Sequence, residues 1–206
     1  MKKHHIFFAI PLIALSLILV AFGYEKGYEI GDTVEDFNLK NVNGEMVSMS
    51  DYEDAKGFMV TFTCNHCPYA KLYEERIMEL DKKYASKGYP VIAINPNDPA
   101  QVPDDSFERM QEVAEEKGYT FPYLFDSTQE VAKRFGATRT PHLYILQKSG
   151  NSALVVKYIG AVDNNPKDGD AADKHYVENA LKDLMMGKEV RKSMTKAIGC
   201  TIKWKE

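Results

Sequence analysis

Short apolar runs bounded by turn residues recur along the chain and predict the strands of a β-sheet. Residues 58–63 are mostly β-branched or aromatic, which suits a buried central strand. Residues 90–94 form a second buried run. The Asn43-Gly44 pair is typical of a tight turn between two strands. The remaining predicted strands span residues 37–40, 45–47, 121–125, 142–147 and 154–159.

Between these runs the apolar residues repeat with the period of a helix. The longest helix is predicted to begin near Pro68, because the fixed φ of proline suits the first helical turn, and to end at Gly88. Its expected buried face consists of Tyr69, Leu72, Tyr73, Ile77, Leu80 and Tyr84.

Two pairs of residues have the spacing of a helix-capping box. Asp105 and Glu108 predict one helix, and Ser127 and Glu130 predict a shorter one. A last helix is expected over about residues 173–186. Helices that alternate with strands imply parallel crossovers, and the final hairpin implies an antiparallel edge. The sequence therefore predicts an α/β fold, a mixed central sheet flanked by helices.

The first 23 residues have the features of an export signal. Two lysines precede an apolar run over residues 6–22, and Ala21-Phe22-Gly23 matches a cleavage site. A run of this length is at the lower limit for spanning a bilayer, so membrane anchoring through residues 6–22 is the alternative to cleavage. Either way we expect the domain to be exported, to the periplasm or the outer face of the membrane.

A single domain is predicted over residues 24–187, followed by a C-terminal tail over residues 188–206. The tail contains Ile202 and Trp204, which an unattached tail seldom carries. We therefore expect the tail to dock on the domain.

The charge pattern excludes one class of function. The chain has 26 basic and 30 acidic residues and a formal net charge of −4. Basic and acidic residues alternate along the whole chain rather than forming a basic stripe. We therefore expect no nucleic-acid partner.

The chain has three cysteines, Cys64, Cys67 and Cys200. Three are too few for a disulfide scaffold, and a single C-x-x-C motif is a poor structural zinc site, which would need four ligands. Redox chemistry remains as the leading use. Thiol–disulfide exchange needs only sulfur, so we expect no metal and no cofactor.

Cys64 follows the predicted central strand and precedes the predicted long helix. There the free N–H groups and the helix dipole stabilise a thiolate. Cys67 lies one turn further on, and we expect it to displace a substrate held on Cys64. His66 is close enough to bring its imidazole to the Cys64 sulfur, which would favour the thiolate. These residues predict a thiol–disulfide oxidoreductase.

The motifs also resemble those of a known family. The opening from Gly31 to Leu39 and the Phe-x-Cys-Asn-His-Cys-Pro-Tyr string from Phe62 to Tyr69 are similar to thioredoxin-like redoxins related to AhpC/TSA proteins. The resemblance covers residues 28–187 and implies a thioredoxin-like fold with a redoxin-type insertion near residues 97–125.

The resemblance also assigns roles to individual residues. It implies Cys64 as the nucleophile, Cys67 as the resolving cysteine, and Thr140-Pro141 as a substrate-docking loop with a cis peptide bond. The implied partners are disulfide-containing or dithiol proteins and a separate redox protein that recycles the enzyme.

The chain departs from thioredoxin at a functional position. Thioredoxin buries an acid six residues before its first cysteine, and this chain has Phe58 there. The sequence therefore does not identify the group that accepts the proton of the resolving Cys67 thiol.

Two other functions remain as alternatives. A peroxiredoxin places a threonine three residues before its attacking cysteine, as Thr61 stands here, but it has proline where this chain has Gly57, and Arg139 is its only candidate arginine. A copper chaperone would bind the soft metal through Cys64, Cys67 and His142.

Cys200 has two interpretations that the sequence leaves open. It is either a structural thiol in the docked tail or a third redox partner of the C-x-x-C pair.

Overall fold

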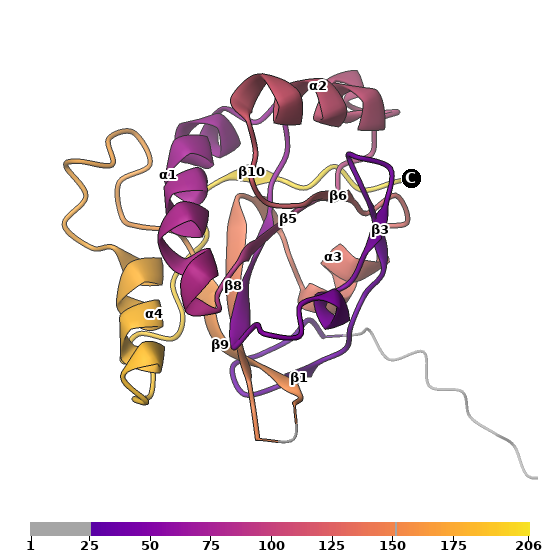
Figure 1. The fold of residues 1–206 in the computed structure, drawn as a ribbon. Coiled ribbons are helices and arrows are strands. Elements are labelled where there is room, and N and C mark those ends of the chain that lie inside the picture. The colour runs from indigo at the N-terminus through magenta and orange to yellow at the C-terminus, as the bar shows by residue number, and fades with distance from the viewer. Residues whose placement is uncertain (1–25, 151) are drawn as a thin grey trace, which may run out of the picture.

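The computed structural model describes residues 26–150 and 152–206 (Figure 1). An eight-stranded mixed sheet forms the centre, in the order β1-β9-β8-β4-β5-β6-β2-β3, and a two-stranded sheet pairs β10 with β7. The strands span Thr33–Val34 (β1), Leu39–Asn41 (β2), Met46–Val47 (β3), Gly57–Phe62 (β4), Val91–Asn95 (β5), Tyr123–Phe125 (β6), Arg139–Thr140 (β7), His142–Lys148 (β8), Leu154–Gly160 (β9) and Cys200–Thr201 (β10).

The segment predicted as signal or anchor, residues 1–23, lies outside the described residues. Among the described residues, no helix is long and apolar enough to cross a membrane.

Strand β4 is the centre of the sheet, as the sequence predicts. All six of its residues are buried. It pairs in parallel with β5 and antiparallel with β8, and Phe62 lies opposite His142 at its carboxyl end. A strand covered on both faces favours apolar residues at nearly every position, which explains why Thr61 is the one polar residue of this strand.

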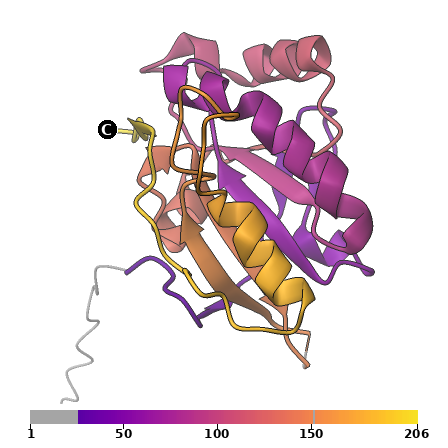
Figure 2. The ribbon, with the colours of Figure 1, turned by 90° about the vertical axis from the view of Figure 1, so that its left-hand side faces the viewer.

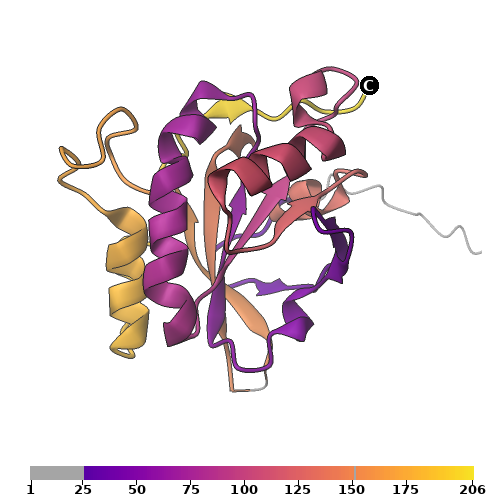
Figure 3. The same ribbon diagram turned by 45° about the horizontal axis from the view of Figure 1, so that its top comes forward.

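Within the described residues, four α-helices cover the sheet: α1 (Pro68–Tyr84), α2 (Phe107–Lys117), α3 (Glu130–Phe135) and α4 (Tyr176–Met185). Helices α1 and α4 lie side by side on one face (Figures 2 and 3). Tyr73 of α1 and Leu181 of α4 belong to the apolar core of that face, whereas Phe135 of α3 packs with Phe58 and Phe62 in the core of the other face. The predicted α/β class with a mixed sheet between helices is confirmed.

The first turn of α1 differs from the prediction. Tyr69 is 40% exposed and Leu72 is 44% exposed, although the helical period placed them on the buried face. Ala70 is buried in their place and packs against the cysteines. Because the turn nearest the cysteines faces them rather than the core, the apolar stripe of the helix begins only at Tyr73.

The two predicted capping boxes are also wrong in detail. Ser106, not Asp105, caps α2, and its hydroxyl accepts a hydrogen bond from the Arg109 backbone N–H. Gln129 rather than Ser127 precedes α3. Asp105 precedes α2 and its cap, and its side chain contacts residues of the site described below.

The C-terminal segment runs from the end of α4 back along the sheet to the end where α1 begins (Figures 1 and 2). Ile202 is buried in the core that contains Phe135, and Trp204 packs on its edge. Gln129 holds the same segment with its side-chain amide, which donates to the Lys203 carbonyl and accepts from the Lys205 N–H.

Candidate redox site

The C-x-x-C motif lies at the junction that the sequence predicts. Strand β4 ends at Phe62, Cys67 is the N-cap residue of α1, and Pro68 is at the first helical position. Cys64 is in the short loop between the two elements. The N–H group at the first helical position has no partner within the helix, so a proline, which lacks this group, fits there. The helix can therefore begin directly after the second cysteine.

The cysteines pair differently from the expectation. Cys67 forms a disulfide with Cys200, with the two Cα atoms 6.1 Å apart, and Cys64 is a free thiol. Strand β10 places Cys200 opposite Thr140, and the Thr140 carbonyl oxygen lies 3.2 Å from Cys67 Sγ. Backbone pairing of the tail therefore brings Cys200 to the more deeply buried cysteine of the motif. Cys200 is therefore not a free structural thiol, because it forms a disulfide with the second cysteine of the motif.

The Cys64 thiol is buried rather than presented to solvent. The residue is 5% exposed, and its Sγ lies 3.2 Å from the Thr140 hydroxyl oxygen. Burial, and to a smaller extent the nearby Asp105 carboxylate, raises the pKa of Cys64 to about 11, although the Thr140 hydroxyl opposes the shift. The shift favours the protonated thiol over the expected thiolate, because loss of solvent outweighs the helix terminus.

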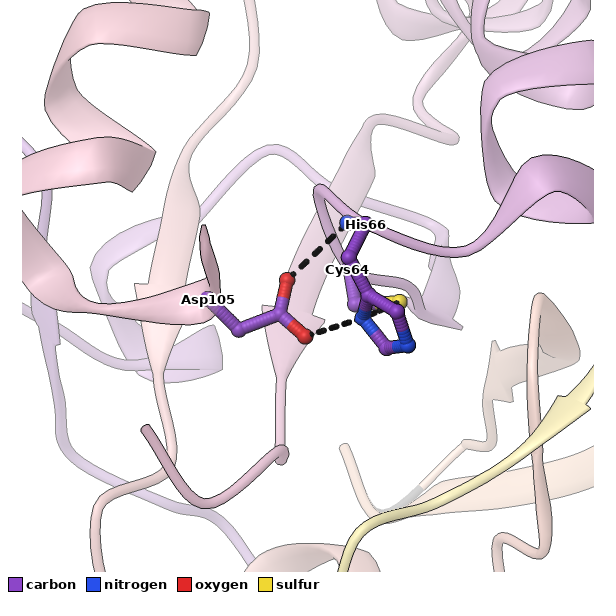
Figure 4. A group of neighbouring side chains, drawn as sticks. All are labelled: Cys64, His66 and Asp105. Carbon is purple, nitrogen blue, oxygen red and sulfur yellow. Dashed lines mark hydrogen bonds and ion pairs between the residues drawn. The ribbon is translucent and has the colours of Figure 1, made fainter. Parts of the chain in front are cut away.

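His66 approaches Cys64 as predicted, and it does so together with Asp105 (Figure 4). The His66 Nδ1 atom lies 3.7 Å from Cys64 Sγ and 2.5 Å from Asp105 Oδ2. Asp105 is fully buried. Its other oxygen accepts the backbone N–H of Asn65 at 2.7 Å, and Asn97 donates to Oδ2 at 2.7 Å. A buried carboxylate with these partners fixes the imidazole beside the thiol.

Asp105 is the functional residue that the sequence analysis missed. Its spacing from Glu108 is that of a cap, and this local explanation hid the distant contact with the redox loop. A signal was available, because thioredoxin needs a buried acid near its cysteines and Phe58 cannot supply one. The insertion that carries Asp105 is where such an acid could be sought.

Cys64, His66 and Asp105 are also the one group of three potential metal ligands within the described part of the chain. Their donor atoms lie within 4.8 Å of one another. The hydrogen bond between His66 and Asp105 already uses two of the three donor atoms. Because these two residues are already paired with each other, we assign no metal ligands here.

The predicted docking loop lies against the motif. The Thr140–Pro141 peptide bond is cis, as expected. Thr140 contacts both cysteines of the motif, Cys64 through its hydroxyl and Cys67 through its carbonyl oxygen. The structure therefore brings together all five residues that the sequence selected, namely Cys64, His66, Cys67, Thr140 and Pro141.

The structure does not assemble the residue sets of the two alternative functions. The Arg139 guanidinium donates to the Gly199 carbonyl at 3.5 Å rather than to Cys64. For copper, Cys67 is bonded to Cys200, and His142 contacts Tyr144 instead of joining a ligand group. Burial lowers the pKa of His142 to about 4, so its imidazole is neutral.

A cavity of about 320 Å³ adjoins the redox loop. Residues of the loop, α1 and α2 line it, among them Cys64, Lys71, Glu74 and Arg109. No residue of the tail from 188 onward is part of its lining. The cavity and the docked tail therefore adjoin different sides of the redox loop.

Comparisons with known proteins agree with this site. Residues 30–155 match the AhpC/TSA family, and because this is more than half of the chain, the protein belongs to that family. It is similar to the thiol-disulfide oxidoreductase ResA of Bacillus thuringiensis, with 23% identity over 76% of this chain and 90% of the relative. ResA of Oceanobacillus iheyensis is 25% identical over 76% of this chain and 83% of the relative.

Solved structures give the same picture of the fold. A conserved protein from Geobacillus kaustophilus has a TM-score of 0.78 and 39% identity, covering 86% of this chain and 93% of that one. A protein from Sinorhizobium meliloti has a TM-score of 0.78 and 31% identity, covering 87% of this chain and 97% of that one. Together with the relatives by sequence, these comparisons confirm the redoxin resemblance and the predicted class, a thioredoxin-like thiol–disulfide oxidoreductase.

Proposed function

We propose that Cys64 and Cys67 form the redox pair of this oxidoreductase, with Cys64 as the attacking cysteine. The arrangement around the Cys64 sulfur carries the proposal. The His66–Asp105 pair lies on one side of the sulfur, and Thr140, which precedes the cis proline, contacts it as well. A proton acceptor and a loop suited to peptide docking therefore meet at one thiol.

Exchange begins when Cys64 loses its proton and its thiolate attacks one sulfur of a substrate disulfide. The Cys64–substrate bond forms, and the second substrate sulfur leaves as a thiolate. In the form in which Cys67 is reduced, the Cys67 thiolate then attacks Cys64 Sγ. The substrate leaves fully reduced, and Cys64 and Cys67 are joined. The reverse sequence oxidises a substrate dithiol with the same residues.

The His66–Asp105 pair supports this chemistry as the proton acceptor for Cys64. The imidazole is within reach of the sulfur, and the buried carboxylate stabilises the imidazolium that forms when the proton arrives. Asp105 thus supplies a buried acid for Cys64, whereas the acid of thioredoxin serves the resolving thiol. The acid comes from the insertion instead of from the strand.

The substrate class follows from the docking loop and the thiol chemistry. An extended peptide can pair with the backbone at Thr140, beside Pro141, and present its sulfur to Cys64. The substrates are accordingly disulfide-containing or dithiol proteins, and a separate redox partner recycles the pair. Residues 1–23 direct the domain out of the cytoplasm, to the periplasm or the outer face of the membrane, either cleaved or as an anchor.

The test is the division of labour between the two sulfurs. Cys64→Ser should abolish exchange with a disulfide-bonded peptide, because no attacking thiol remains. Cys67→Ser should accumulate a mixed disulfide through Cys64, which gel electrophoresis without reductant and peptide mapping detect. A mixed disulfide that forms in Cys64→Ser, through Cys67, and not in Cys67→Ser would reverse the assignment.

A further inference from the structure

The C-terminal segment occupies the edge at which the proposed function docks a peptide. Strand β10 pairs antiparallel with β7, so that Cys200 lies opposite Thr140 and Thr201 lies opposite Arg139. The Ile202 N–H continues the ladder to the Thr138 carbonyl at 3.4 Å. A substrate strand and the tail would therefore use the same backbone groups and exclude each other.

Gly199 fits the tail closely to the cis-proline loop. A Cβ atom at this position would lie 2.3 Å from the Thr140 carbonyl oxygen and 2.9 Å from the Pro141 nitrogen. Both are backbone atoms that cannot move aside easily. Glycine is therefore required for the observed approach of Cys200 to Cys67.

The docked tail is also linked to the proton acceptor of Cys64. The Lys203 N–H donates to Asn97 Oδ1 at 2.8 Å, and Asn97 Nδ2 donates to Asp105 Oδ2 at 2.7 Å. The same Oδ2 atom binds His66. The Asn97 side chain thus binds both the tail and the Asp105 carboxylate, which in turn positions the His66 imidazole.

All three cysteines lie in one apolar cluster with Ala70, and the disulfide already joins Cys67 to Cys200. We propose that Cys200 is a third catalytic cysteine and that residues 199–205 are an internal substrate, which closes the redox centre while the Cys67–Cys200 disulfide stands. This inference rests on the proposed function of Cys64 and Cys67.

The site opens by an exchange within the protein. Cys64 gives its proton to the His66–Asp105 pair, and its thiolate attacks Cys67 Sγ. The Cys64–Cys67 bond forms, the Cys67–Cys200 bond breaks, and Cys200 leaves as a thiolate that takes up a proton. One disulfide is present before and after, so the step consumes no oxidant or reductant. The reverse attack of the Cys200 thiolate on Cys67 closes the site again.

Peptide mapping tests where the disulfide resides. The full chain is equilibrated in oxidised and reduced glutathione, quenched with acid, alkylated and digested with trypsin. Cys64 and Cys67 share the tryptic peptide 57–71, and Cys200 lies in peptide 197–203. We expect the two peptides cross-linked through Cys67, with Cys64 alkylated. A disulfide found only inside peptide 57–71 at every glutathione ratio would overturn the proposal.

The Gly199→Ala variant tests the docking without changing a cysteine. We expect the ratio of cross-linked to internal disulfide to fall about tenfold, which corresponds to about 1.4 kcal/mol against the closed form. Gly150→Ala is the matched control, because Gly150 has open space for a Cβ and is remote from the motif in sequence. An equal ratio in Gly199→Ala and Gly150→Ala would contradict the internal-substrate role.

The same samples separate this inference from the proposed function. Loss of exchange in Cys64→Ser without any cross-linked 57–71/197–203 peptide in the wild-type protein would overturn the role of Cys200 and leave the Cys64/Cys67 pair in place. The cross-linked peptide in a protein whose exchange survives Cys64→Ser would instead overturn the proposed attacking role of Cys64.

Discussion

The two sides of the redox loop are built from different parts of the chain. One side determines the surroundings of the Cys64 proton, and the other determines the disulfide partner of Cys67. The insertion, through Asn97 and Asp105, sets the surroundings of the Cys64 proton. The tail, through Gly199 and Cys200, sets the sulfur to which Cys67 is bonded. The motif itself supplies neither the acid nor the third sulfur. The four residues of the motif define the class of reaction. The two distant segments determine the environment of the Cys64 proton and the disulfide partner of Cys67.

The burial of Cys64 between the two segments should make stability depend on pH. Its pKa is raised from 9.0 to about 11, so the folded chain keeps a proton that the unfolded chain loses. The stabilisation is complete below about pH 9 and is lost as pH rises toward 11, by about 3 kcal/mol. Urea unfolding of the wild type and of Cys64→Ser across this range measures it. Parallel stability curves for the two proteins would show that Cys64 does not titrate there.

On the tail side, Ile202→Ala should lower the free energy of unfolding by about 2 kcal/mol, because the side chain is buried in the sheet core. Met194→Ala is the control, since Met194 is exposed and its truncation should change little. Denaturant unfolding under oxidising conditions compares them. Equal stabilities would mean that the tail is not anchored through Ile202.

On the insertion side, Asp105→Asn should lower the pKa of Cys64, because the carboxylate raises it by charge repulsion with the thiolate. Each unit of the shift increases the thiolate fraction about tenfold below the pKa. Thiolate absorbance across pH measures the change. The control is Asp104→Asn, an exposed neighbour whose side chain has no described contact with the motif. A pKa that moves equally in both variants would remove the specific role of Asp105.

The smallest expected effect concerns His66, which lies between the insertion and the thiol. His66→Leu should remove a group that favours the thiolate, so the pKa of Cys64 should rise and the Cys64/Cys67 couple should become more reducing. A contribution of about 1 kcal/mol corresponds to roughly 20 mV for the two-electron couple. Equilibration with glutathione measures the potential, with the exposed His175→Leu as control. An unchanged potential would leave the helix terminus as the activator.

Much of the fold could be predicted because its signals are local. The buried run at residues 58–63, the Pro68 helix start and the strand pairs follow from periodicity and turn chemistry, and the structure keeps them. The same reasoning places Cys64, His66 and Cys67 together, since they are neighbours in sequence. The exposed first turn of α1 shows the limit of this reasoning, because a helical period cannot reveal that Tyr69 faces away from the core.

The rest of the site depends on contacts between segments far apart in sequence. The local sequence around Asp105 is equally compatible with a helix cap. Whether its side chain caps a helix or contacts the redox loop depends on the path of the insertion. Cys67 and Cys200 are separated by 133 residues, and no local pattern links them. An odd number of cysteines and a glycine next to Cys200 were the available hints, and neither identifies a partner.

The 133-residue separation of Cys67 and Cys200 makes the thermal stability of the protein depend on which cysteines form the disulfide. Closing so large a ring restricts the unfolded chain and raises stability by about 5 kcal/mol, whereas the small Cys64–Cys67 ring would add only about 2 kcal/mol. Replacing Cys200 by Cys64 as the disulfide partner of Cys67 would therefore change the melting temperature by several degrees. The reduced protein would melt lowest of all. A melting curve taken directly on a cell extract would then indicate which bond the molecule held in its native surroundings.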